Sequence, residues 1–170
     1  MLHTMRRSLV VAVVLLVALA AMPLALAGGG HERPFKEDLT GYGMPPIADP
    51  VLVEARCGEG ALWISTMTGT GTITHLGRVT WEAEHCFYDD FMSFGASELT
   101  ITAANGDQLF GTYTGSMTGP TTWLDDLTIV GGTGRFEGAT GEVAESGWYD
   151  PDTEYMEITG EGWIAYAPGR

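Results

Sequence analysis

Basic residues are scarce in this 170-residue chain, where 8 Lys and Arg stand against 22 Asp and Glu and give a formal net charge of −14. Nucleic-acid binding requires clustered Lys and Arg to neutralise phosphates, so the composition argues against it. The same shortage argues against electrostatic attachment to anionic lipid. We therefore expect neither nucleic acid nor, once the N-terminal segment is removed, a membrane among the partners.

Beyond residue 27 the sequence also lacks long apolar runs and amphipathic helical repeats, which excludes a helical bundle. Within residues 1–27, Arg6 and Arg7 precede an apolar stretch over 9–19, and Ala25-Leu26-Ala27 supplies a small-x-small cleavage site. These features predict a secretory signal peptide cleaved after Ala27 and a mature protein outside the cytoplasm. An uncleaved membrane anchor is the alternative.

Cysteine is limited to Cys57 and Cys86. In an oxidising compartment we interpret the pair as one disulfide that closes a loop of about 30 residues, with two buried free thiols as the alternative. Two isolated cysteines lack the further ligands that zinc needs, and the acidic turn over 150–154 lacks the glycine and spacing of a calcium loop. We therefore predict no metal site and no cofactor.

Residues 28–50 hold four prolines and show no sustained periodicity, so we expect a flexible lead-in there and a single domain over 51–170. In that domain short runs of Val, Ile, Thr, Trp and Tyr alternate with glycines and acidic turns. This pattern predicts an all-β domain, and about eight antiparallel strands favour one closed barrel, with a β-sandwich as the alternative. The expected strands are 51–55, 61–68, 70–74, 78–87, 98–103, 108–115, 121–130, 141–149 and 155–166.

Asn105 and Gly106 predict a hairpin with a two-residue type I′ turn, because both residues tolerate a positive φ. That register places Leu99, Ile101 and Phe110 on one face, which we interpret as the interior. Alternation in the neighbouring strands adds two tryptophans to the same interior. The candidate ligand-lining residues are Trp81, Leu99, Ile101, Phe110 and Trp123.

The glycine-rich segment 132–138, GTGRFEG, follows the apolar run 127–130 and superficially matches a dinucleotide-binding loop. That function requires a helix to receive the pyrophosphate, and the residues that follow are β-like instead. We therefore expect a tight reversal between barrel strands.

The longer segment 129–141, IVGGTGRFEGATG, resembles the GGTGxFxxAxG turn of the allene oxide cyclase and dirigent barrel superfamily. The segments GTGT at 69–72, LGR at 76–78 and AANGD at 103–107 are similar to uncharacterised secreted bacterial members. The resemblance covers about residues 57–166 and implies an eight-stranded antiparallel barrel around an apolar cavity, often in homo-oligomers. Relatives cyclise reactive lipid or polyketide intermediates or steer phenoxy-radical coupling, but the shared turn carries no catalytic residue.

Two polar residues are candidates for acid–base chemistry inside the barrel. Asp125 shares the face of Trp123, and a carboxyl group in an apolar interior would have a raised pKa; a solvated rim position is the alternative. His75 faces inward only if the alternation of Val79 and Trp81 continues through Gly77, and otherwise has a structural or rim position. His85 lies beside Cys86 at a strand end, where we expect it to be exposed.

Three functional hypotheses follow from the sequence. The first is a secreted barrel that binds a small apolar or aromatic molecule. The second is a cyclase or isomerase that confines a reactive lipid or polyketide-like substrate, assisted by Asp125 or His75. The third is a surface protein whose barrel interior is fully packed and non-catalytic.

Overall fold

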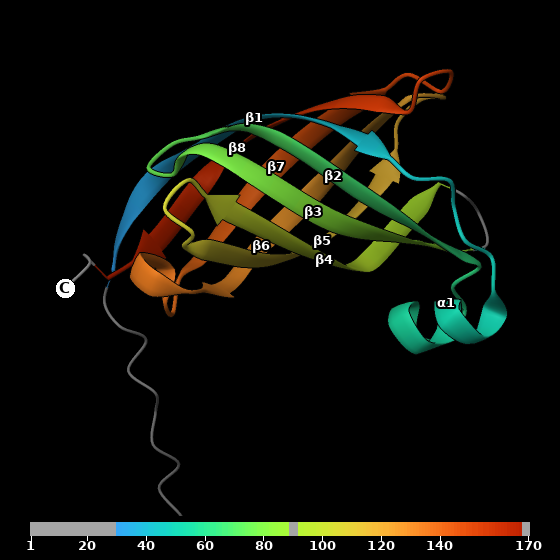
Figure 1. The fold of residues 1–170 in the computed structure, drawn as a ribbon, viewed down its shortest axis with the longest axis horizontal. Helices are drawn as coiled ribbons and strands as arrows, with labels where there is room; N and C mark the ends of the chain where they lie inside the picture. Colours follow the sequence, from blue (N-terminus) through green and yellow to red (C-terminus); the bar gives the residue numbers. More distant parts are fainter. Residues whose placement is uncertain (1–29, 89–91, 168–170) are drawn as a thin grey trace, which may run out of the picture.

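The computed structural model describes residues 30–88 and 92–167, so the expected signal peptide lies outside the described residues. Eight antiparallel strands close into a barrel in which β1 pairs with both β2 and β8 (Figure 1). The predicted eight-stranded barrel is confirmed, and the sandwich alternative is wrong. The elements are β1 His31–Gly43, α1 Pro50–Cys57, β2 Trp63–Ile73, β3 Gly77–Phe87, β4 Ser93–Ala103, β5 Gln108–Met117, β6 Thr122–Gly132, the 3₁₀ turn η1 Gly134–Phe136, β7 Thr140–Tyr149 and β8 Tyr155–Tyr166.

The expectation of a flexible lead-in over 28–50 is wrong, because residues 31–43 form strand β1. Phe35 and Leu39 point into the barrel, but the inward positions between and after them are Glu37 and Gly41. An acid and a glycine at two of four inward positions conceal the alternation by which a strand is recognised. The barrel therefore starts at His31 rather than at residue 51.

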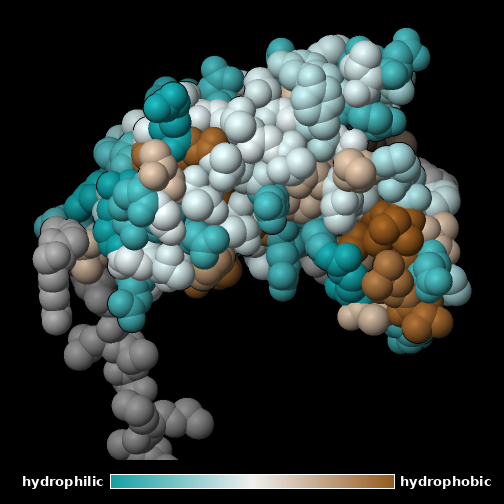
Figure 2. Space-filling view, viewed as in Figure 1, coloured by the Kyte–Doolittle hydropathy of each residue, from teal (hydrophilic) through white to brown (hydrophobic). Residues whose placement is uncertain are grey.

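The strand expected at 51–55 is also wrong, since this segment belongs to helix α1. Asp49 caps the helix by accepting hydrogen bonds from the amides of Val51 and Leu52, both at 3.0 Å, and Pro50 occupies its first turn. Val51 and Leu52 lie on the solvent side of α1, where Figure 2 shows a concentration of apolar surface. No helix in the described ranges is long and apolar enough to cross a membrane.

The β4–β5 hairpin differs from the expected register by one residue. The amide of Ala103 donates to the carbonyl of Asp107 at 2.9 Å, so the loop has three residues, with Gly106 at a φ of 88°. Ile101 consequently pairs with Leu109, and Phe110 turns to the outer face. Because side chains alternate along a strand, this slip reverses the predicted orientation of every β5 residue. The segments 61–68 and 70–74, expected as two strands, form the single strand β2.

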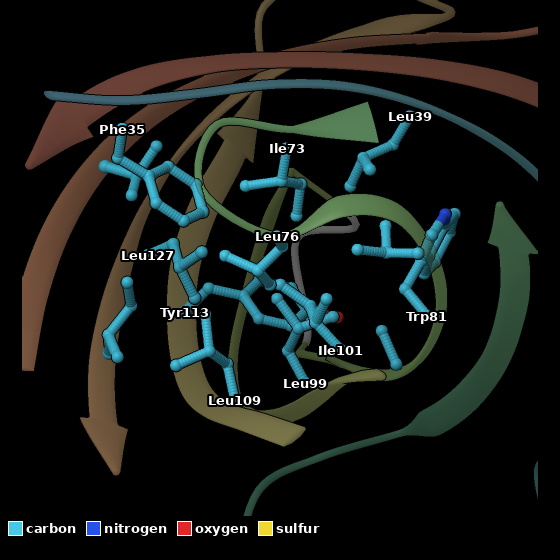
Figure 3. Close-up of a cluster of buried hydrophobic side chains, with 14 of the residues drawn as sticks. Phe35, Leu39, Ile73, Leu76, Trp81, Leu99, Ile101, Leu109, Tyr113 and Leu127 are labelled. Carbon is cyan, nitrogen blue, oxygen red and sulfur yellow. The ribbon is translucent and has the colours of Figure 1, made fainter. Parts of the chain in front are cut away.

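The barrel interior is packed with apolar side chains at the end where the β2–β3 and β4–β5 hairpins meet η1 (Figure 3). Leu76 enters from the β2–β3 hairpin, and Phe136 of η1 packs edge-on against Tyr166 with ring centroids 5.0 Å apart. Deeper in the barrel, Trp81 lies across Gly41 and Gly69, where a Cβ atom on either glycine would collide with the indole. This end of the barrel is therefore closed.

A second, smaller apolar cluster lies outside the barrel, between α1 and the sheet. It consists of Val53 and Cys57 from the helix together with Ile64 and Cys86 from β2 and β3. Cys57 and Cys86 form a disulfide with a Cα–Cα distance of 5.5 Å, as predicted from the sequence. The disulfide and an ion pair between Arg56 and Glu84 hold α1 against the barrel.

We expect the double variant Cys57→Ala with Cys86→Ala to lose about 3 kcal/mol of unfolding free energy, because the crosslink restricts the unfolded chain. Urea unfolding of the variant and of the wild type with and without dithiothreitol measures this loss. The reduced wild type should match the variant, and amides of α1 should exchange faster in both. An unchanged unfolding free energy would show that the cluster holds α1 without the crosslink.

Candidate functional site

The end of the barrel opposite η1 is open and contains a cavity of ≈ 470 Å³. Its walls come from the strand ends and from the connections at residues 44–46, 117–120 and 150–154. Methionine and aromatic side chains dominate the lining. The lining residues are Gly43, Met44, Pro46, Trp63, Ser65, Met67, His85, Phe87, Met92, Phe94, Met117, Gly119, Pro120, Trp123, Tyr149, Pro151, Glu154 and Met156.

The cavity depends on glycines that let large rings lie flat against the barrel wall. A Cβ atom at Gly147 would collide with the indole of Trp123, and one at Gly115 would lie 2.6 Å from the ring of Phe94. These rings therefore occupy space next to the backbone instead of the centre of the barrel. The volume between them stays open.

Below the cavity three carboxyl groups meet inside the barrel. Asp125 on β6 pairs with Glu145 on β7, and both Glu145 and Glu37 pair with Gly160 on β8. Because Gly160 has no side chain, the carboxyl groups of Glu37 and Glu145 approach each other across it; a Cβ there would collide with Glu37. We call Glu37, Asp125 and Glu145 the carboxyl trio.

The carboxyl trio is almost fully buried, with exposed fractions of 5%, 6% and 7% for Glu37, Asp125 and Glu145. The indole N–H of Trp123 donates to Asp125 Oδ2 at 3.0 Å, and Glu145 lies within hydrogen-bonding reach of both other acids. Both oxygens of Glu37, Oδ1 of Asp125 and Oε1 of Glu145 accept no hydrogen bond from an N–H or O–H of the described residues.

Burial raises the pKa of all three acids, and the pKa of Glu145 rises well above its usual range because Glu37 and Asp125 also repel its negative charge. The buried carboxyl oxygens therefore obtain hydrogen-bond partners when members of the trio hold protons and donate them to one another. Among the described residues, no three His, Cys, Asp or Glu side chains are placed to hold a metal ion.

His85 lies in the cavity wall, in contrast to the expected exposed position. The alternation of β3 continues to the end of the strand, so His85 points inward while Cys86 points outward to the disulfide. Its ring stacks on Phe94 with centroids 4.5 Å apart and meets Tyr113 at 5.0 Å. Burial lowers the pKa of His85 to about 3, so the imidazole is neutral at physiological pH.

The structure places the sequence-derived candidates at different levels of the barrel. Trp123 lines the cavity, whereas Asp125 lies beneath it in the carboxyl trio. His75 is wrong as an interior candidate: it lies exposed in the β2–β3 hairpin with a φ of 69° and its Nε2 3.1 Å from the carbonyl of Pro34. The turn interrupts the strand before His75, so the parity of β3 does not extend to it.

The other candidate ligand-lining residues do not reach the cavity. Trp81, Leu99 and Ile101 belong to the packed core, and Phe110 lies on the outer face. Glu37 and Glu145 were missed in the sequence. The inward set of β7 is Gly141, Val143, Glu145, Gly147 and Tyr149, so the parity of Val143 was the signal that could have identified Glu145.

Comparison of the sequence with protein-family models and with curated proteins gives no match. Among solved structures, the pterocarpan synthase dirigent protein GePTS1 is similar to this chain, with a TM-score of 0.51 and 13% identity over 82% of this chain and 88% of that chain. The chain has a dirigent-type barrel fold. The resemblance noted in the sequence is thus confirmed for the fold, and at this identity it shows the fold alone. In this dirigent-type barrel the cavity, His85 and the carboxyl trio form the candidate site.

The raised pKa of Glu145 makes stability depend on pH in a defined direction. The folded state keeps a proton that the unfolded state releases near pH 4.5, so the unfolding free energy falls as pH rises above that value. We expect Glu145→Gln to flatten this fall and to be more stable than the wild type at pH 8, because the amide has no proton to lose. Urea unfolding between pH 4 and 9 measures the difference. Glu142→Gln, on the exposed face of the same strand, is the control and should follow the wild type.

The lowered pKa of His85 acts in the opposite direction. The unfolded state takes up a proton near pH 6.5 and the folded state only near pH 3, so this contribution to stability is full above 6.5 and is lost between 6.5 and 3. His85→Phe keeps the aromatic stack. The wild type should lose about 1.4 kcal/mol of unfolding free energy per pH unit in that interval because of His85, and the variant should not show this loss. Acid unfolding curves that run parallel for His85→Phe, the wild type and the exposed control His75→Asn would contradict this assignment.

Proposed function

We propose that this protein binds a small apolar or aromatic molecule in the open end of its barrel. The observation that carries the proposal is the ≈ 470 Å³ cavity lined by five methionines and five aromatic residues. This volume lies in the range of small-molecule sites, and an apolar lining with few polar groups is typical of them. Methionine side chains adapt to irregular ligand shapes and make favourable contacts with aromatic rings.

The polar groups of the cavity support the same proposal. Ser65, His85 and Glu154 are the lining residues with hydrogen-bonding or charged side chains apart from the tryptophan N–H groups and the Tyr149 hydroxyl. His85 is neutral, so it offers a hydrogen bond without a charge. A largely apolar ligand therefore meets little unpaired polarity on entry.

Action outside the cytoplasm is part of the proposal. The Cys57–Cys86 disulfide and the dirigent-type fold are consistent with an extracellular protein. The signal-peptide pattern over residues 1–27 supports the same compartment.

A cyclase or isomerase is the second candidate, favoured by one contact. The Trp123 indole lies in the cavity wall and also donates to Asp125, which links a bound molecule to the carboxyl trio. A protonated trio would supply a proton donor at this site, and the neutral imidazole of His85 would form a hydrogen bond with a bound molecule. Catalysis differs from binding in one observable, the chemical alteration of the bound molecule.

To test binding, we compare the ligand affinity of a variant whose cavity is filled by a tryptophan with that of a variant carrying a tryptophan outside the cavity. We expect 2-naphthylmethanol to bind the wild type in isothermal titration calorimetry, and Met117→Trp to weaken its affinity at least about tenfold by occupying the cavity. Leu124→Trp adds the same side chain to the exposed face of β6 and should leave the affinity unchanged. Equal affinities for all three proteins, or no binding to the wild type, would contradict the proposal.

A further inference from the structure

Among the described residues that line the cavity, one carries a formal charge. Of its 18 lining residues, none is Lys or Arg, and His85 is held neutral by burial. Glu154 is the remaining ionisable acid, and it lies at the lip of the cavity, where the β7–β8 turn meets the end of β1. A ligand that enters this cavity therefore meets a neutral interior and a negative lip.

Glu154 is fixed at the lip by its backbone. It is one of two non-glycine residues with a positive φ in the described ranges, at 58°. Its amide donates to the carbonyl of Asp150 at 2.8 Å, and its own carbonyl accepts from the amide of Gly43 at 2.9 Å. A Cβ at Gly43 would lie 3.5 Å from Glu154 Oε2, so the carboxylate leans over that glycine. These contacts fix the position of the Glu154 side chain beside the cavity.

Within residues 30–88 and 92–167, no Lys, Arg or His side chain forms an ion pair with the carboxylate of Glu154. The ion pairs of the described residues are Lys36–Glu161, Arg56–Glu84 and Arg135–Asp107. Asp150 and Asp152 lie in the same turn, and Asp150 accepts a hydrogen bond from the amide of Asp152 at 2.9 Å and another from the Thr153 hydroxyl. These hydrogen bonds lower the pKa of Asp150 and keep its carboxylate ionised.

The surroundings of the lip strengthen its preference for positive charge. The chain carries a net charge of −14, which draws cations toward the protein and repels anions. The aromatic residues Trp63 and Tyr149 also line the cavity, and aromatic rings attract cations that approach their faces. The described lining residues include no Lys or Arg to pair with a carboxylate or phosphate on a ligand.

We propose that the ligand of this cavity is a hydrophobic amine, with its apolar body among the methionine and aromatic side chains and its ammonium group beside Glu154. The inference rests on the proposed function and adds the charge of the ligand to it. It predicts that, among molecules of similar shape, the affinity for the cavity depends on the charge beside Glu154: cations bind most tightly and anions most weakly.

Three probes of similar shape test the ranking: 2-naphthylmethylamine, 2-naphthylmethanol and 2-naphthoate. At low ionic strength and pH 7 we expect the amine to bind the wild type about three- to tenfold more tightly than the alcohol, as for a partly exposed charge pair. The naphthoate should bind more weakly than the alcohol. Raising the salt to about 0.5 M should shrink the advantage of the amine, because salt screens an exposed pair.

Glu154→Gln removes the charge and keeps the shape of the lip. We expect it to abolish the advantage of the amine and to leave the affinity for 2-naphthylmethanol unchanged. Glu157→Gln, on the exposed face of β8, changes the net charge equally and should retain the advantage.

The outcomes separate this inference from the proposed function. Binding of the alcohol that Met117→Trp blocks, without any advantage for the amine, would overturn the inference and leave the binding function intact. An advantage that persists in Glu154→Gln would also overturn it, since long-range charge alone would then explain the ranking. Failure of all three probes to bind the wild type would overturn both.

Discussion

Closure of the barrel through β1 is the constraint on which the rest of the structure depends. β1 pairs with β2 along one edge and with β8 along the other, so no strand edge remains and each strand has one inward face. Inward residues must then fill a limited volume. Leu76 and Phe136 close one end, while Gly115 and Gly147 let rings lie against the wall at the other. The cavity at the open end is thus a consequence of where large and small inward residues lie.

Four ionisable groups lie inside the barrel, the carboxyl trio and His85, and the neutral form of the trio is protonated whereas that of His85 is deprotonated. The carboxyl trio is neutral when it holds protons, so a rise in pH works against it, whereas His85 is neutral when it has lost its proton, so a fall in pH works against it. With the trio protonated and His85 deprotonated, the interior below and within the cavity carries no charge. Among the described lining residues, formal charge then remains at Glu154 on the lip, where water reduces the free-energy cost of the charge. An apolar cavity with one charged rim follows from this separation.

The sequence predicted those features that follow from alternation among apolar residues. Strands β3 to β8 and the barrel belong to this group, and alternation also nominated Asp125 as an inward residue. The disulfide was predicted separately, from the two cysteines of the chain. The alternation failed to identify a strand face where an inward residue is polar, as at Glu37 in β1. It also failed where an outward residue is apolar, as at Trp148 in β7, which points away from the face that carries Glu145. It also failed where one backbone detail decides the outcome: the three-residue loop at 104–106 reversed the orientation of Phe110, and the cap at Asp49 made a helix of an apparent strand. Carboxyl groups contributed by distant strands meet only in the folded chain.

Helix α1 lies outside the barrel, yet its attachment bears directly on the cavity. Cys86 joins α1 through the disulfide on the outer face of β3, while its neighbours His85 and Phe87 form cavity wall on the inner face. The chain that leads from β1 into α1 lines the cavity through Met44 and Pro46, and Ile47 bridges to Ile64 of β2 just before the helix begins. A displacement of α1 therefore acts on the cavity by two routes, through β3 and through the 44–47 connection. The small cluster beneath the helix, with its crosslink, holds one side of the candidate site from outside the barrel.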